Sequence, residues 1–193
     1  MRSFSVSRST LVAAFLATLI LLPPSLVFAH GAPTLPHRVA ALEVRGELPA
    51  PPTGVTNIKF GEFFRMPVGP LGLEPTEKLL SLNGQKIRLI GYVVREEEPI
   101  PGRFLLSPLP VSLGDEDESL ADDLPPTTVF VHLQGVKEHR VPYLNGLIQL
   151  TGRLEVGAKE EGGGRVSTLR LILDARVSKQ ILAAKPLFRT AAK

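Results

Sequence analysis

The sequence predicts a mainly β protein: a small five-stranded OB-like barrel with one short N-terminal helix and an extended N-terminal arm. From residue 85 onward, apolar and polar residues alternate with a period of two in five segments, as in strands that bury one face. Two of these segments carry an internal glycine, which lets a sheet bend or coil. Five strands within about 90 residues fit a closed or nearly closed barrel of the OB type best, with a small open sandwich as the second choice.

The first 29 residues have the organisation of a secretory signal. Arg2 and Arg8 form a positively charged start, and an unbroken run of apolar and small residues follows from Leu11 to Leu22. Small residues precede a cleavage site after Ala29, so we expect loss of residues 1–29 and a periplasmic or secreted domain. An uncleaved anchor is the alternative, but the run is short against the roughly 20 residues that a spanning helix needs. We therefore expect no spanning segment after cleavage.

Charge and composition exclude several classes of function. Loss of residues 1–29 removes two arginines and no acidic residue, so the formal charge falls from +3 to +1. A nearly neutral chain presents no strong field to nucleic acid or anionic lipid, and we expect no nucleic-acid partner. The chain has no cysteine, which excludes disulfides, thiolate metal sites, a cysteine nucleophile and a lipoprotein anchor.

Three segments precede the strands. Residues 30–57 are rich in Pro, Gly and Ala without a sustained period, which predicts a flexible linker. Residues 58–73 hold apolar side chains close to Gly and Pro, so we expect an extended arm that docks on the core. Residues 74–82 predict a short helix, because Pro75 lies near the first turn and Gly84 follows the last.

The OB-like domain is expected over residues 58–175, followed by a basic C-terminal tail over 176–193. Its strands are rich in β-branched and apolar residues and are expected over 86–95, 103–108, 127–133, 146–156 and 166–174. Gly91 and Gly152 are the internal glycines and indicate a bulge or sharp bend. The tail carries five Lys or Arg and no acid, so it is either a solvated tail or a contact for an anionic membrane or a partner.

A run of six acids within residues 115–123 suggests a divalent-metal site. An EF-hand loop starting at its first residue would need glycine at the sixth position and glutamate at the twelfth, where Leu120 and Pro126 stand instead. None of the four histidines has the close spacing that fixes a metal. The run is therefore interpreted as a solvated loop, and an irregular metal site is kept as the alternative. The candidate ligands are Asp115, Asp117, Asp122, His132 and His139.

Sequence motifs of the common enzyme classes are missing. The chain has no Gly-x-Ser-x-Gly, no His-Glu-x-x-His, no P-loop and no Rossmann glycine pattern. Aromatic residues are few and tryptophan is absent, which disfavours the stacking surface that an OB-type barrel uses on single-stranded nucleic acid. We therefore expect no catalytic residues.

The strand motifs resemble an uncharacterised family of exported bacterial proteins with small OB-like β domains. The matching residues are Leu82 to Tyr92, Phe104 to Pro108, Pro125 to Val131 and the segment 146–152, within a similarity that covers about residues 58–175. The family loop before the prolines carries cysteine and histidine, whereas this chain has the acidic run there. A metal or redox role of that loop therefore does not carry over. The resemblance implies an accessory component of envelope transport.

Together these features predict a non-enzymatic binding or accessory domain of the bacterial cell envelope. Its expected partner is an envelope protein, and no cofactor is expected. The alternative is a metal-binding accessory protein of an envelope transport system, with a divalent metal bound by the acidic run and a histidine.

Overall fold

The five expected strands belong to one hydrogen-bonded sheet in the computed structural model, which describes residues 36–113, 124–136, 138–161 and 164–186. A short sixth strand, β2 (Thr56–Asn57), joins them, so the chain is mainly β with a six-stranded mixed sheet. The five longer strands are β3 (Lys86–Val93), β4 (Arg103–Ser107), β5 (Val129–Leu133), β6 (Leu147–Glu160) and β7 (Val166–Leu173). The expected signal peptide lies outside the described residues.

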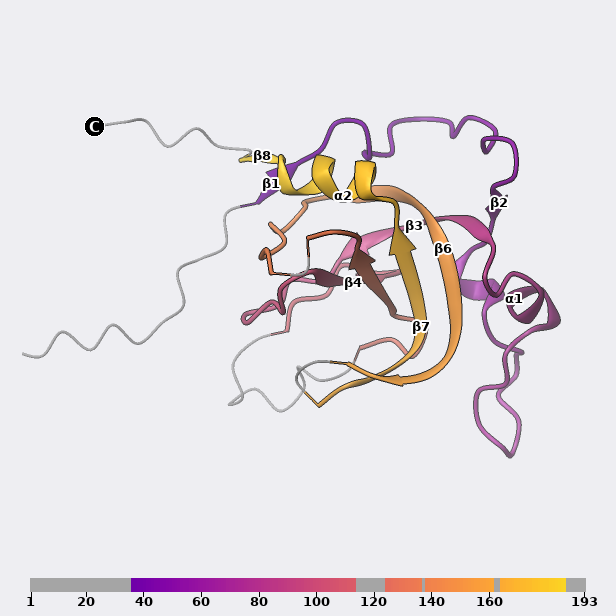
Figure 1. Cartoon of the computed structure of the whole chain (residues 1–193). Helices are drawn as coiled ribbons and strands as arrows, with labels where there is room; N and C mark the ends of the chain where they lie inside the picture. Colours follow the sequence, from indigo (N-terminus) through magenta and orange to yellow (C-terminus); the bar gives the residue numbers. More distant parts are fainter. Residues whose placement is uncertain (1–35, 114–123, 137, 162–163, 187–193) are drawn as a thin grey trace, which may run out of the picture. The chain divides into compact units, whose positions relative to one another are not determined.

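The strand order is β2-β3-β4-β5-β7-β6, and β3 pairs with β6 as well. The pairs β2–β3 and β5–β7 are parallel, while β3–β4, β4–β5, β6–β7 and β3–β6 are antiparallel. Each of the strands β3 to β7 therefore has a neighbour on both sides. Figure 1 shows β6 and β7 curving together along one side of the sheet.

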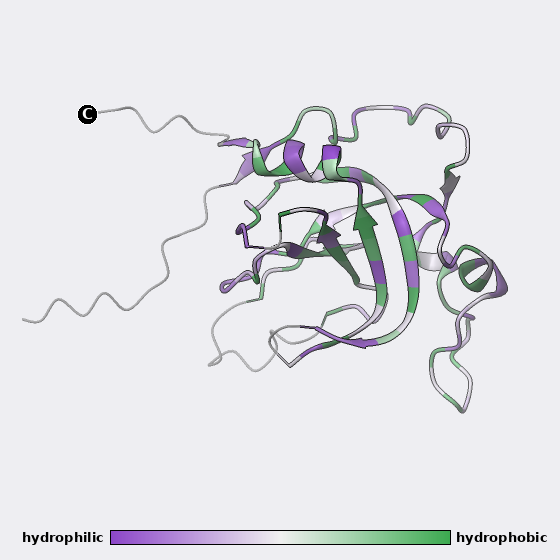
Figure 2. Cartoon of the chain, viewed as in Figure 1, coloured by the Kyte–Doolittle hydropathy of each residue, from purple (hydrophilic) through white to green (hydrophobic). Residues whose placement is uncertain are grey.

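Apolar and polar residues that alternate along the strands lie alternately in the core and on the outer face of the sheet. In β5, Val129, Val131 and Leu133 are buried in the main core, whereas His132 between the last two is only half-buried. Hydrophobic and hydrophilic bands likewise alternate along β6 and β7 in Figure 2. The other strands contribute to the same core Ile87, Leu89, Val93, Phe104, Leu106, Ile148, Leu150, Leu154, Leu169, Leu171 and Leu173.

The two internal glycines lie where strands approach closely. A Cβ atom at Gly152 would stand 2.6 Å from the Ile172 carbonyl oxygen, and one at Gly91 would stand 2.7 Å from the Ser107 carbonyl oxygen. The β3–β6 ladder runs through both glycines without a register shift, so neither lies at the bulge that the sequence indicated. Both positions need glycine because backbone of the next strand occupies the space of a side chain.

The described part of the expected linker, residues 36–57, packs against the sheet instead of standing free. The Gln149 amide donates to the Leu42 carbonyl (2.7 Å), the Val44 amide donates to the Leu147 carbonyl (3.0 Å), and Leu42 is buried. One buried apolar residue in a segment without periodicity leaves no pattern in the sequence, which explains why this docking was not predicted.

Buried Arg88 of β3 attaches the end of the same segment. Its Nε donates to Asn57 Oδ1 (2.8 Å) and its Nη2 donates to the Pro49 carbonyl (2.8 Å). Hydrogen bonds from a buried charged donor are stronger than those between neutral groups. The arginine therefore fixes residues 49–57 beside β3.

The expected arm docks through its first residues. Ile58, Phe60 and Phe63 are buried around the 3-10 helix η1 (Phe60–Glu62). The helix predicted over 74–82 is α1 (Glu77–Ser81), and the Thr76 hydroxyl accepts the Leu79 amide (3.1 Å) as its N-cap.

The expected basic tail begins instead with a helix that belongs to the fold. Residues 175–182 form α2 (Ala175–Leu182), and β8 (Lys185–Pro186) pairs with β1 (His37–Arg38). Figure 1 shows α2 beside this short pair. Ile181 is completely buried, and the buried Ser178 hydroxyl accepts the Gln134 amide (3.0 Å). The basic residues are the most evident feature of this segment in the sequence, so the apolar stripe of the short amphipathic helix was not recognised.

Candidate functional site

A second, smaller apolar cluster lies on the outer face of β4 and β5. Leu105 and Phe130 stand opposite each other in the antiparallel β4–β5 ladder and are buried together with Val94. Val111, Leu113 and Leu124 pack against this cluster. The cluster gives the outer face an apolar base, and the charged groups described next surround it.

Arg103 is a desolvated cation on this face. Its side chain projects beside Phe130, with the guanidinium carbon 5.0 Å from the ring centroid, and the residue is only 3% exposed. Burial lowers the pKa of Arg103, while the charges of Glu96 and Glu161 oppose that shift. An arginine side chain stays charged in proteins. The face therefore holds a positive charge against an aromatic ring, an arrangement that electrostatic attraction stabilises.

A chain of polar contacts runs from β5 across the end of the β6–β7 hairpin. His132 Nε2 lies 3.2 Å from Glu161 Oε1, and the Ser167 hydroxyl donates to the same oxygen (2.7 Å). Arg170 Nη1 donates to Ser167 Oγ (2.9 Å), and Arg170 Nε donates to Glu155 Oε2 (3.3 Å). These contacts hold the hairpin end against β5.

The order of groups in this chain does not form a nucleophilic triad. A Ser-His-acid triad needs the imidazole between the hydroxyl and the carboxylate, and here Glu161 stands between Ser167 and His132. Ser167 is also completely buried. Burial lowers the pKa of His132 more than Glu161 raises it, so the imidazole is held in its neutral form. The arrangement positions side chains and offers no activated hydroxyl.

Two cavities open beside the ring of Phe130. One of about 430 Å³ is lined by Arg103, His132, Glu161 and Lys159 together with the turn at residues 100–102. The other, of about 390 Å³, is lined by Phe130 itself. The Arg103 guanidinium lies over that ring, so this contact links a residue of one lining to a residue of the other. We call the two together the β4–β5 groove.

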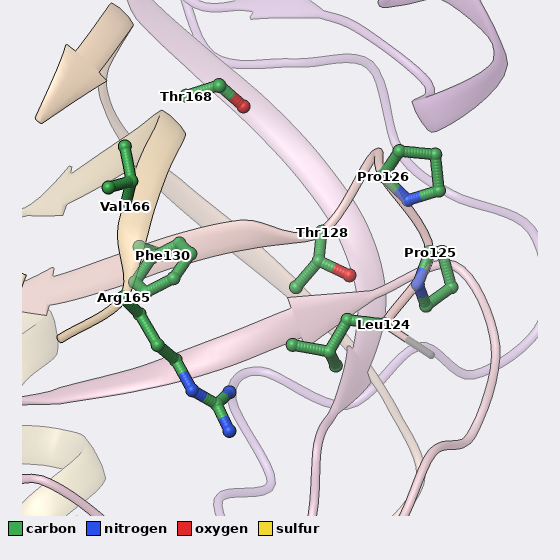
Figure 3. Close-up of a pocket in the computed structure, with 8 residues that line it drawn as sticks. All are labelled: Leu124, Pro125, Pro126, Thr128, Phe130, Arg165, Val166 and Thr168. Carbon is green, nitrogen blue, oxygen red and sulfur yellow. The ribbon is translucent and has the colours of Figure 1, made fainter. Parts of the chain in front are cut away.

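The second cavity is lined by five apolar and three polar side chains, and we call it the proline cavity. Figure 3 shows its prolines on one side and Val166 and Arg165 on the other. Its lining residues are Leu124, Pro125, Pro126, Thr128, Phe130, Arg165, Val166 and Thr168. Thr128 Oγ1 and Arg165 Nη1 are buried there without a hydrogen-bond partner. Glu96 interacts electrostatically with Arg165 and with Arg103. Burial raises the pKa of the Glu96 carboxyl, and the charges of these two arginines oppose that rise without cancelling it.

A third cavity, of about 520 Å³, lies between residues 38–41 and the end of α2. Its walls are mainly the small side chains of Ala40, Ala41, Ala183 and Ala184. Arg38 at its edge is already paired with Glu43. This cavity therefore offers less chemistry to a ligand than the β4–β5 groove.

Of the metal ligands predicted from the sequence, only the histidines lie in the described part of the chain. His132 lines the larger groove cavity, and His139 is exposed in the β5–β6 connection, where its carbonyl accepts the Gly102 amide (2.9 Å). Asp115, Asp117 and Asp122 lie outside the described residues. Within the described ranges, no three His, Cys, Asp or Glu residues converge as a metal site would require.

Several groove residues were not singled out from the sequence: Arg103, Thr128, Phe130, Glu161 and Arg165. Phe130 and His132 alternate with Val129 and Val131, so a strict period-two reading places both on the outer face. An arginine at the first position of an apolar strand, as in β4, was a further signal. The contribution of the β6–β7 hairpin depends on tertiary pairing, which no local pattern shows.

Comparison with known proteins gives little further identification. No family model and no curated protein matches the chain. It is similar to the crystal structure of a DUF3299 family protein from Pseudomonas aeruginosa PAO1, with 14% identity and a TM-score of 0.42 over 60% of this chain and 90% of that one. DUF denotes a domain of unknown function. A likeness at this level carries no argument about export, an OB-like barrel or a ligand.

The helices in the described ranges are short. None of them has the length and apolar composition that crossing a membrane requires.

Proposed function

We propose that this chain is an exported, non-enzymatic binding domain of the bacterial cell envelope, and that its partner is a protein held in the β4–β5 groove. The observation that carries the proposal is the desolvated Arg103 guanidinium on Phe130, with a cavity on either side. Arginine and aromatic side chains in well-packed, dry surroundings are the residues that most often dominate protein interfaces. Such a pair at an open groove favours partner binding.

We further propose that the strands form an OB-like barrel. The pairings β3–β4, β4–β5, β5–β7, β7–β6 and β6–β3 return to the starting strand, which supports this reading. Binding surfaces of OB folds use the second and third strands and two adjoining loops. The corresponding parts here are β4, β5, residues 94–102 and the described ends of the β6–β7 connection at residues 161, 164 and 165. The strand topology therefore favours the same groove that the side chains indicate.

The charges in the groove favour a protein over a nucleic acid. Arg103, Arg165 and Lys159 are accompanied by Glu161 in the lining and by Glu96 nearby, so acids offset much of the positive charge. A nucleic-acid site needs an excess of positive charge to displace counterions from the phosphates. Mixed charges around an apolar centre are typical of protein interfaces.

Site-specific photocrosslinking in the producing cell tests the groove as the binding face. A photoreactive residue replaces exposed Thr168 at the rim of the proline cavity, and the matched control replaces exposed Ser81 in α1. We expect a discrete protein adduct from position 168 that position 81 does not give and that Arg165→Glu abolishes. Equal adducts from both positions, or an adduct indifferent to Arg165→Glu, contradict the proposal.

Export is tested separately by fractionating the same cells and sequencing the N-terminus of the protein. We expect the chain in the envelope fraction, beginning at His30. A cytoplasmic chain that retains residues 1–29 contradicts this part of the proposal.

A further inference from the structure

We propose that the proline cavity binds a carboxylate carried next to an apolar group, contributed by the polypeptide of the partner. The inference rests on the proposed binding function and deepens it, because it names the chemical group that the groove recognises. Buried polar atoms without partners and apolar side chains line the same cavity of about 390 Å³.

The unpartnered atoms define what the ligand must supply. Arg165 Nη1 and Thr128 Oγ1 are buried without a hydrogen-bond partner. Buried polar groups in proteins are nearly always hydrogen-bonded, and leaving them unpaired is unfavourable. A guanidinium nitrogen can only donate, and a hydroxyl can donate as well, so acceptor oxygens are the ligand atoms that suit both groups.

The geometry of an arginine favours a carboxylate among such acceptors. The planar guanidinium matches the two oxygens of a carboxylate, and the resulting charge-assisted hydrogen bonds are stronger than those to a neutral acceptor. Arg165 is the one cationic side chain that lines this cavity in the described part of the chain. The acids nearby offset its charge, since Glu96 interacts electrostatically with both Arg165 and Arg103. This balance suits a single negative charge and disfavours a doubly charged phosphate.

The walls define the rest of the ligand. Leu124, Pro125, Phe130 and Val166 present apolar surface around the polar atoms, and Val166 is 59% exposed. Burying an apolar side chain against them is favourable in proportion to the area removed from water. A carboxylate without an apolar neighbour would leave this surface wet, so the recognised unit is an acid joined to an apolar body.

Two parts of a polypeptide carry such a unit: a chain terminus that ends in an apolar residue, and an acidic side chain next to one. Titration of the mature chain, followed by amide chemical shifts in NMR, separates them. The probes are N-acetyl-leucine, its neutral amide, and N-acetyl-glutamyl-leucinamide, whose only carboxylate is in the side chain. We expect at least one carboxylate probe to shift the amides of Phe130, Val166 and Thr168 with a Kd of about 10 mM or tighter, and the neutral amide to bind at least about tenfold more weakly.

Variants test the assigned atoms. Arg165→Gln removes the charge, and Thr128→Val removes the hydroxyl while keeping the shape of the side chain. Both variants are expected to weaken binding of the carboxylate probe. The control is Arg65→Gln, which changes an exposed side chain in the arm and is expected to leave Kd unchanged. Equal binding of acid and amide, no effect of Arg165→Gln, or no saturable shift in the cavity overturns the inference. If the probes fail while the Thr168 crosslink persists, the binding function stands and the carboxylate assignment is wrong. If the probes bind and no crosslink forms, the cavity is a carboxylate site and the protein partner is wrong.

Discussion

The close approach of β6 and β7 at Gly152 makes a quantitative prediction about stability. In Gly152→Ala the new methyl carbon would stand 2.6 Å from the Ile172 carbonyl oxygen and 3.0 Å from Leu171 Cγ. Both distances are shorter than an ordinary van der Waals contact. The first neighbour is backbone of a paired strand, which cannot change rotamer as a side chain can. The two strands must therefore separate locally.

The expected loss is about 1–3 kcal/mol in the free energy of unfolding, the range for overpacking a filled interior. The backbone contact places Gly152→Ala in the upper part of this range. A domain of this size loses about 2–4 °C in Tm for each kcal/mol, so we expect a fall of about 5–10 °C. The total stability of such domains is only about 5–15 kcal/mol, so this is a substantial fraction.

Urea unfolding followed by circular dichroism measures the effect, because a lower midpoint at unchanged m-value reports stability alone. The matched control is Gly61→Ala in η1, where a Cβ atom has nothing within 4 Å. The control is expected to be neutral or slightly stabilising, since alanine restricts the unfolded chain. Equal midpoints for the two variants would refute the close approach of β6 and β7.

Three further substitutions test other parts of the structure. Ile181→Ala should cost about 2–5 kcal/mol in urea unfolding, because the completely buried side chain holds α2 on the core; a change near zero would mean that α2 is a free tail. Burial raises the pKa of Glu96 above 4.5, so this carboxyl stays protonated to higher pH in the native state and the free energy of unfolding falls as pH rises from 4.5. Glu96→Gln should remove this fall, and parallel stability–pH curves for the two proteins would contradict the shift. Burial lowers the pKa of His132 below 6.5, so the free energy of unfolding falls as pH drops from 6.5. Urea unfolding between pH 5 and 8 should show no such fall for His132→Gln, and an unchanged slope would show that the imidazole is not desolvated.

Much of the sheet could be predicted from the sequence because each long strand buries one face. The alternation in Val129–Leu133 and in the Leu-rich segment 166–173 directly records which side chains enter the core. The docking of residues 36–57 and of α2 depends on single buried residues, Leu42 and Ile181, whose partners lie far away in sequence. A lone apolar residue between Pro, Gly or Lys gives no periodic signal, so these segments were predicted as linker and tail.

The candidate site was less accessible to sequence reasoning than the fold. His132 was singled out as a possible metal ligand, and it does line the groove, but its contact is Glu161 from a hairpin 29 residues later. Arg165 looks like an ordinary surface charge in the sequence, and Arg103 is marked only by its place at the start of the apolar strand β4. Their burial arises from Phe130 and from the pairing of β5 with β7, which places the hairpin end beside β4 and β5. Such pairings are tertiary properties that residue spacing does not encode.

We propose the β4–β5 groove as the face on which a partner binds. Hydrogen–deuterium exchange of the mature chain, with and without the partner captured by crosslinking, tests it most directly, because exchange reports protection along the whole backbone. We expect added protection in residues 124–133 and 164–168, which line the groove, and none in α1 or the exposed loop at residues 66–73, where Leu71 is 89% exposed. Protection of α1 and that loop, with the groove segments unchanged, would contradict it.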